Sequence, residues 1–85
     1  MPLTSMVRPN GPRVREIRRR MDLTQEEMAH RLRRSRMTVS NIEAGRTVSK
    51  IVMRQVARSL RVSFDEITLA GPAEADDEQP EAEAA

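Results

Sequence analysis

The sequence predicts an all-α domain of five short helices, followed by a disordered acidic tail. Apolar residues recur at spacings of three and four positions through most of the chain, which is the period of a helix with one buried face. Residues that cap helix N-termini stand just before these segments. Residues 71–85 hold six acids, no base and few apolar side chains, a composition that does not support a folded core. We therefore expect a flexible arm over residues 1–10, one helical domain over 11–70 and a disordered tail over 71–85.

Length and composition narrow the class of protein. A chain of 85 residues with one aromatic side chain is expected to form a single small domain with an aliphatic core. The absence of cysteine excludes disulfides, cysteine-based zinc sites and thiol catalysis. No apolar run approaches the roughly 20 residues of a membrane span, and no signal peptide opens the chain. We expect a cytoplasmic protein that needs no cofactor, binds no metal and has no contact with a membrane.

Charge is distributed unevenly along the chain. All 15 basic residues lie in residues 1–70 together with seven acids, so that segment carries a charge of +8, whereas the tail carries −6. A basic domain with an acidic tail suggests a polyanionic partner. The alternative is a bias of composition, because 14 of the 15 bases are arginine, which a GC-rich genome also favours.

The first helix is expected to begin at residues 11–12, where a proline at the first helical position costs no hydrogen bond. Val14, Ile17 and Met21 follow the helical period and make one buried stripe. The helix then ends at Asp22, because aspartate tolerates the left-handed conformation better than most residues.

The second and third helices both carry capping signals. Thr24 and Glu27 form a capping box, and the helix that they start buries its apolar side chains at 28, 29 and 32. Ser35 caps the third helix, which ends at Ala44 before Gly45, the residue type favoured just after a helix.

The last two helices are expected over residues 47–60 and 63–69. Thr47 or Ser49 opens the fourth helix, whose inward residues are Val52, Met53, Val56, Ala57 and Leu60. Residues 63–66 read S-F-D-E, a second capping box, and they start a short fifth helix that includes Ile67.

The second and third helices are joined by a turn of three or four residues, which is the helix-turn-helix arrangement. In this arrangement the second helix of the pair enters the major groove of DNA, and the first crosses the phosphate backbone. A helix over about 36–44 suits that groove, because it is short, capped and, apart from Met37, polar on its outer face.

Two motifs at fixed spacing resemble a known family. The run T-Q-E-E-M-A covers residues 24–29, and S-x-x-x-V-S-x-I-E-x-G covers residues 35–45. Together they resemble the Cro/CI repressor-type helix-turn-helix family, also called Xre-like, and the resemblance extends over residues 12–69. It implies a compact five-helix repressor-like domain that binds double-stranded DNA, usually a palindromic operator, as a two-fold homodimer.

The resemblance also implies roles for individual side chains. The positions expected to read bases are Arg36, Met37, Ser40 and Asn41. The positions expected to contact phosphates are Gln25, Thr38, Arg46 and Thr47, together with Arg34 in the turn. Glu43 matches a family acid that pairs with an arginine of the first helix, here Arg18, and this pair is structural.

Several of these roles have alternatives. Met37 either contacts a thymine methyl or packs as core against the second helix, and Arg36 binds either a guanine edge or a phosphate. Asn41 pairs with adenine or reaches only a phosphate. Arg33 and Arg34 stand where the family usually has glycine and an aliphatic residue. Either Arg33 adopts the left-handed conformation, at a cost of about 1–2 kcal/mol relative to glycine, or the second helix runs on.

The function expected is sequence-specific regulation of transcription, most simply by repression. The second hypothesis is an antitoxin-type regulator that also binds a toxin or another protein partner, with the acidic tail as one docking element. A third is that the tail competes with DNA for the basic face, against the simpler alternative that it only aids solubility. An enzyme is not expected, since the chain has one histidine, no cysteine and no glycine-rich phosphate loop.

Dimerisation is expected because one recognition helix reads only a few base pairs. The candidate dimer residues are Phe64, Ile67 and Leu69, which exceed what the core of a monomer needs. The alternative for Phe64 is that it fills the core.

Overall fold

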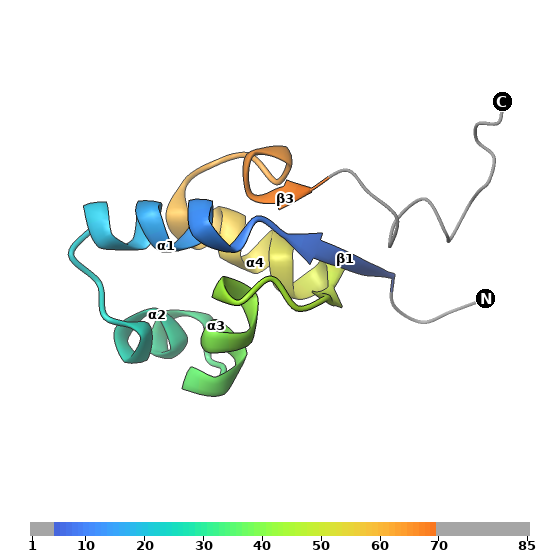
Figure 1. Cartoon of the computed structure of the whole chain (residues 1–85). Helices are drawn as coiled ribbons and strands as arrows, with labels where there is room; N and C mark the ends of the chain where they lie inside the picture. Colours follow the sequence, from blue (N-terminus) through green and yellow to red (C-terminus); the bar gives the residue numbers. More distant parts are fainter. Residues whose placement is uncertain (1–4, 70–85) are drawn as a thin grey trace, which may run out of the picture.

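The computed structural model describes residues 5–69, which form four α-helices, one 3₁₀ turn and three short strands (Figure 1). The helices are α1 (Gly11–Arg20), α2 (Gln25–Leu32), α3 (Arg36–Glu43) and α4 (Lys50–Leu60), and the 3₁₀ turn is η1 (Asp65–Ile67). The strands are β1 (Met6–Pro9), β2 (Val48–Ser49) and β3 (Thr68–Leu69). The acidic tail and residues 1–4, which the sequence predicts to be disordered or flexible, lie outside the described residues.

Each α-helix begins after a side chain that caps it. The Asn10 side chain accepts from the backbone N–H of Arg13 before α1. Thr24 forms the full predicted capping box with Glu27 before α2. The remaining caps are Ser35 before α3 and Ser49 before α4. Ser49 is therefore the start of the fourth helix, which the sequence left open between two residues.

The α-helices end in the same kind of turn, in which one residue adopts a positive φ angle. These residues are Asp22, Arg33, Gly45 and Arg61, with φ angles of 58°, 57°, 85° and 61°. In each case the N–H of the following residue bonds back to a carbonyl five residues earlier, as Arg34 does to Ala29 at 2.9 Å. This hydrogen bond satisfies a carbonyl that the helix end would otherwise leave open. The same geometry decides between the two alternatives for the turn after α2: Arg33 adopts the left-handed conformation, and α2 does not run on.

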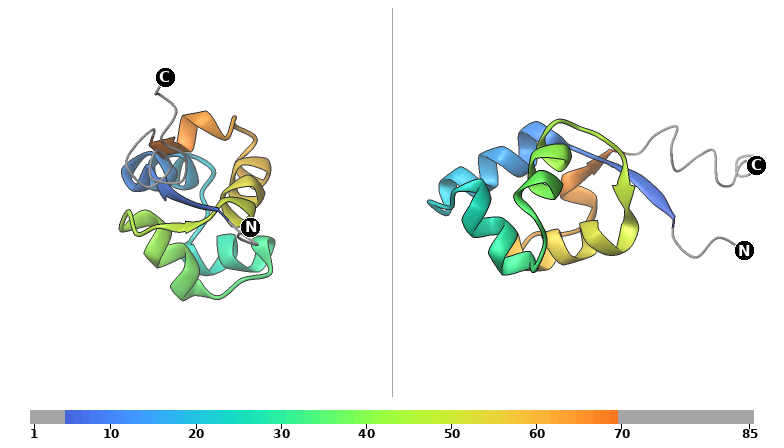
Figure 2. Two further views of the ribbon diagram at one scale, coloured as in Figure 1. Left: turned by 90° about the vertical axis from the view of Figure 1, so that its right-hand side faces the viewer. Right: turned by 90° about the horizontal axis from the view of Figure 1, so that it is seen from below.

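The small antiparallel sheet corrects the expectation that the described chain would contain helices only. Its strand order is β2-β1-β3, so β1 lies in the middle (Figure 2, right). Val7 pairs with Val48, and Arg8 pairs with Leu69. The flexible arm predicted over residues 1–10 is thus wrong over 6–9, where Val7 and Pro9 are buried. Two-residue partner strands and a proline leave almost no alternating pattern that would predict a strand.

The predicted fifth helix is also wrong as an α-helix. Residues 65–67 form one 3₁₀ turn, and the chain then extends into β3. The hydroxyl of Ser63 accepts from the N–H of Glu66 as predicted. The carboxylate of Glu66, however, pairs with Arg13 instead of closing the capping box. The need to place Thr68 beside Pro9 in the sheet ends the turn after three residues.

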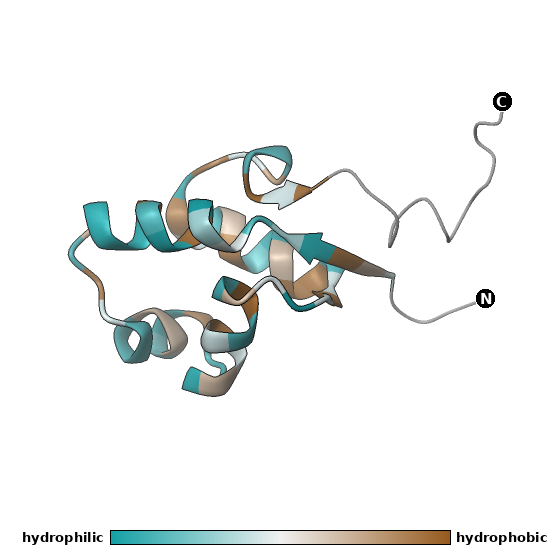
Figure 3. Cartoon of the chain, viewed as in Figure 1, coloured by the Kyte–Doolittle hydropathy of each residue, from teal (hydrophilic) through white to brown (hydrophobic). Residues whose placement is uncertain are grey.

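The core is aliphatic and lies between the helices and the sheet. The buried apolar residues are Val7, Val14, Ile17, Met28, Ala29, Leu32, Val39, Ile42, Val52, Met53, Val56, Ala57, Leu60 and Ile67. In Figure 3 the visible side of α1 is largely teal, whereas α4 behind it carries brown segments. The described residues include no helix long and apolar enough to cross a membrane.

Gly11 allows α1 to approach the end of α3. A Cβ atom at this position would lie 2.2 Å from the backbone oxygen of Glu43. No side chain fits there, so the glycine fixes the distance between the two helices that carry the ion pair described below.

Candidate nucleic-acid interface

The inner face of α3 anchors the helix to the core. Val39 and Ile42 are completely buried, and the helix packs against both α2 and α1. The turn over residues 33–35 between α2 and α3 is short, so the two helices form the predicted helix-turn-helix unit.

The outer face of α3 carries the four side chains predicted to read bases. Arg36 and Met37 are exposed, and Ser40 and Asn41 are half-buried. Met37 is 65% exposed, more than any other large hydrophobic side chain in the described residues. The alternative that Met37 packs as core is therefore wrong. Within residues 5–69, Arg36 forms no ion pair, so its guanidinium group is available to a ligand.

The buried pair of Arg18 and Glu43 joins α1 to the end of α3, as the sequence predicted. Arg18 Nε lies 2.5 Å from Glu43 Oε2, and its second terminal nitrogen (Nη2) lies 3.1 Å from Oε1. Arg18 also donates to the carbonyl of Leu23 at 2.7 Å. Burial raises the pKa of the Glu43 carboxyl, but hydrogen bonds from Arg18 and Gln25 outweigh it, and the pKa is lowered overall. The pair stays charged and ties the C-terminal end of α3 to α1.

Gln25 begins α2 beside the same carboxylate. Its Nε2 donates to Glu43 Oε1 at 3.1 Å. An amide nitrogen has two hydrogens, so the second remains available for a phosphate. Gln25 is thus positioned by the ion pair at the N-terminus of α2, where free backbone N–H groups favour an anion.

Arg15 is a candidate that the sequence reasoning missed. Its Nε lies 3.4 Å from Glu43 Oε1, the same oxygen that Gln25 contacts, and about half of its side chain is exposed. This places a positive charge next to Gln25. The signal that could have found it is the helical spacing of three residues between Arg15 and Arg18, which puts both on one face of α1.

The loop between α3 and α4 carries the other predicted phosphate contacts. Arg46 and Thr47 are exposed, directly after the left-handed Gly45. The loop is held from both sides, because β2 pairs with β1 and the N–H of Lys50 donates to the carbonyl of Ser5 at 2.7 Å. The sheet that the sequence did not predict therefore positions this part of the candidate interface.

Thr38 and Arg34, the other two predicted phosphate contacts, have partners within the domain. The hydroxyl of Thr38 lies 3.2 Å from that of Ser35, in the first turn of α3. Arg34 Nε donates to Gln55 Oε1 on α4 at 3.3 Å, which draws this side chain toward α4.

The predicted dimer residues are separated by the fold. Ile67 is completely buried, so the prediction that it forms a dimer surface is wrong. Phe64 is half-buried and packs against the core, with the guanidinium of Arg54 5.1 Å from its ring centroid. Leu69 is 44% exposed, as are Met6 at 43% and Ile51 at 54%. Of the three predicted residues, only Leu69 belongs to the exposed apolar surface.

A capped helix pair, with an exposed polar face on the second helix and the basic residues Arg15 and Arg46 beside it, defines a helix-turn-helix DNA-binding protein. Residues 14–67 match the family model described as Helix-turn-helix. The chain therefore belongs to this family, of the Cro/CI repressor or Xre-like type, and is a DNA-binding regulator of transcription. The family match begins after β1.

Among solved structures, the chain is similar to the restriction-modification controller protein C.AhdI from Aeromonas hydrophila. The two chains are 33% identical, with a TM-score of 0.62, and the match covers 66% of this chain and 86% of that one. No curated protein matches the chain.

Proposed function

We propose that the chain is a repressor that recognises a specific operator by inserting α3 into the major groove. The observation that carries this proposal is the outer face of α3. Its exposed Arg36 and Met37 stand beside Ser40 and Asn41, on a helix that a buried ion pair holds in place. A rigid helix with several unoccupied side chains suits base recognition, which requires hydrogen-bonding groups at fixed positions.

The side chains of α3 limit the bases that they can read. Arg36 can donate two hydrogen bonds to a guanine edge, and Asn41 can pair with adenine. Met37 offers apolar contact only, and its best partner in the major groove is the methyl group of thymine. Each well-formed bidentate contact discriminates by about 1–3 kcal/mol.

Contacts to phosphates are proposed on both sides of α3. Gln25 and Arg15 bind one strand near the N-terminus of α2, and Arg46 and Thr47 bind the other from the loop after α3. Each phosphate that a basic residue neutralises adds about 0.9 to the salt dependence of binding. Arg15→Ala should therefore reduce that slope by about one while leaving the preferred sequence unchanged.

The repressor is proposed to act as a homodimer on a palindromic operator. One short helix reads only a few base pairs, and two copies related by a two-fold axis read two half-sites. The exposed side chains of Met6, Ile51 and Leu69 are the apolar surface proposed for this contact, in place of the buried Ile67.

The experiment that tests the proposal selects duplexes from a randomised pool and measures their affinity by fluorescence anisotropy. Specific recognition predicts an enriched sequence that binds at least about 10³-fold more tightly than a scrambled duplex. Arg36→Ala and Asn41→Ala should remove most of this preference. Arg20→Ala is the matched control, because Arg20 is exposed on α1 and, within residues 5–69, forms an ion pair with Glu16 alone. No enrichment, or equal loss in the control variant, would refute base reading by α3.

The second candidate is an antitoxin-type regulator that also binds a protein partner. The acidic tail favours it, since six acids in 15 residues provide a charged segment for a basic protein. Copurification of one small partner at a defined stoichiometry from the native host would support this candidate, and a homogeneous dimer would support the simple repressor.

A further inference from the structure

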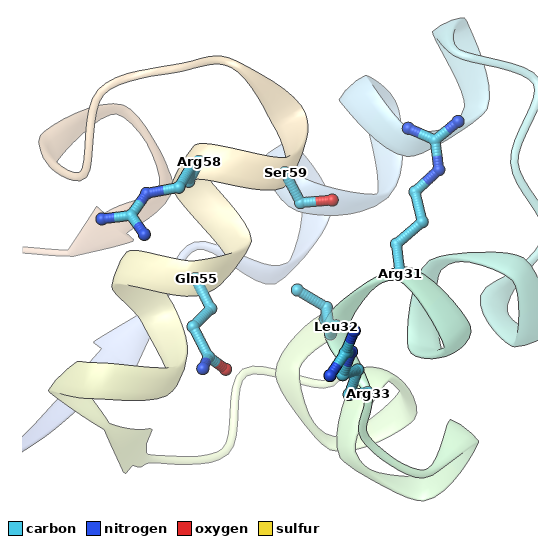
Figure 4. Close-up of a pocket in the computed structure, with 6 residues that line it drawn as sticks. All are labelled: Arg31, Leu32, Arg33, Gln55, Arg58 and Ser59. Atoms are coloured by element: carbon cyan, nitrogen blue, oxygen red, sulfur yellow. The ribbon is translucent and has the colours of Figure 1, made fainter.

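A shallow groove lies between the C-terminal end of α2 and the outer side of α4 (Figure 4). Its volume is about 310 Å³. Six residues line this α2–α4 groove: Arg31, Leu32, Arg33, Gln55, Arg58 and Ser59. In Figure 4 the leucine and the two neutral polar side chains lie between three arginines that stand around the edge.

The charge of this groove is not balanced by the domain. None of Arg31, Arg33 and Arg58 forms an ion pair within residues 5–69, and the lining includes no acid. By contrast, Arg13, Arg18 and the other paired arginines of the domain all lie on α1. Placing like charges around one depression is unfavourable unless a ligand neutralises them.

The α2–α4 groove is distinct from the proposed DNA contacts. The proposed base-reading residues lie on α3, and the proposed phosphate contacts lie on α1 at Arg15, at the start of α2 and in the loop after α3. The groove uses the opposite end of α2 and the C-terminal half of α4. A ligand in the groove would leave the outer face of α3 uncovered.

We propose that the α2–α4 groove binds the acidic segment over residues 74–83 of this chain. That segment carries six carboxylates and no base, and the rest of the chain carries an excess of eight positive charges. Carboxylates match guanidinium groups in geometry, since each pair can form two parallel hydrogen bonds. The complementarity of charge therefore selects this segment as the occupant.

The length of chain after β3 gives the segment a reach comparable to the longest dimension of the protein, 42 Å. The segment follows Leu69, the last residue of β3, after a connection of four residues. At about 3.3 Å per extended residue, residues 74–83 can reach roughly 16–46 Å from that point. A tethered ligand acts at an effective concentration of about millimolar, so even a weak contact is populated.

This contact would give the tail a role that differs from competition with DNA at α3. A bound tail cancels much of the positive charge that drives non-specific attraction to DNA, and it leaves the base-reading residues free. The inference depends on the groove and the tail alone, and it does not require that α3 binds an operator.

The experiment uses the full chain and its lack of cysteine. A single substitution, Ala82→Cys, carries a nitroxide label, and its broadening of backbone amide signals is measured by NMR. The expected result is broadening centred on Leu32, Arg33 and Ser59, lost in the variant Arg31→Gln/Arg58→Gln. It should also disappear near 1 M salt, where the Debye length falls to about 3 Å.

The matched control is Arg19→Gln/Arg20→Gln, which removes the same charge from exposed positions on α1. Thermal unfolding establishes that both double variants are folded. Broadening that persists in the groove variant or falls equally in the control would overturn the proposal. So would broadening centred on α3, which would mean that the tail competes with DNA, or no localised broadening at all. A last outcome would also overturn the proposal and would identify DNA as the occupant. In it, the label never approaches the groove, and a non-specific duplex binds the groove variant more weakly than the control variant.

Discussion

Replacing the left-handed arginines at two helix ends with glycine is expected to stabilise the protein. Arg33 and Arg61 have φ angles of 57° and 61°. This conformation costs a residue with a Cβ atom about 1–2 kcal/mol, and it costs glycine almost nothing. Glycine in turn loses about 0.5–1 kcal/mol more backbone entropy on folding. The expected gain in the free energy of unfolding is therefore about 0.5–1 kcal/mol at each site.

The gain can be measured as a change in Tm. For a domain of this size, 1 kcal/mol corresponds to about 4–8 °C, so each glycine variant should raise Tm by about 2–8 °C. The two effects should add, because the sites end different helices and share no hydrogen bond. Tm is measured by circular dichroism at fixed protein concentration and at high salt, and the salt screens the effect of the lost charge.

Two further variants separate backbone strain from loss of the side chain. Arg33→Ala removes the guanidinium group but keeps the Cβ atom, so it should not raise Tm. Gly45→Ala introduces the strain where the added Cβ would meet nothing within 4 Å, at a φ of 85°. It should lower the free energy of unfolding by about 1 kcal/mol. Glycine variants that melt no higher than their alanine counterparts would show that strain does not limit stability at these ends.

Three other perturbations test the ion pair, the helix contact and the reading of bases. The pKa of Glu43 is lowered in the folded state. The stability that its ionised carboxylate contributes is therefore complete above the pKa of the unfolded chain, about 4.3, and is lost as pH falls through the pKa of the folded protein. Glu43→Gln should cost about 3 kcal/mol at pH 7 and flatten the fall in Tm between pH 5 and pH 3; an unchanged pH profile would contradict this. Gly11→Ala should cost at least about 1–3 kcal/mol by overpacking, since its Cβ would lie 2.2 Å from a backbone oxygen; a Tm equal to wild type would refute the close approach. Replacing single thymines of the selected duplex by deoxyuridine removes the methyl group, and at one position this should weaken wild-type binding but not that of Met37→Ala; equal losses would exclude methyl reading.

The helices could be predicted because their signals are local. Thr24 and Ser35 cap the helices that they precede, and the spacing of Val39 and Ile42 sets the inner face of α3. β1 could not be predicted in the same way. Its hydrogen-bonding partners lie about 40 residues away at Val48 and 60 residues away at Thr68, and each offers only two residues. Pairing over two residues with such distant partners leaves no periodic pattern of residues in the sequence.

The candidate site likewise contains contacts that a local motif indicates and contacts that depend on tertiary packing. The motif around α3 indicated the pair of Arg18 and Glu43, and the structure contains it. The additional contacts of Arg15 and Gln25 to that carboxylate depend on the packing of three helices. The sequence predicts Ile67 as a dimer residue because the apolar residues of its segment exceed what a monomer core needs, whereas the 3₁₀ turn directs its side chain into the core.

The central position of β1 also affects the order in which the elements can fold while the chain is being synthesised. During synthesis residues 6–9 leave the ribosome well before their partners in β2 and β3, which follow at 48–49 and 68–69. The helix pair of α2 and α3 is local and can form early, whereas the first strand must wait until almost the whole domain has emerged. The sheet therefore closes last, and it fixes the loop after α3 at the same moment. A nascent chain that has not yet reached residue 69 would carry a folded α3 beside an unanchored loop.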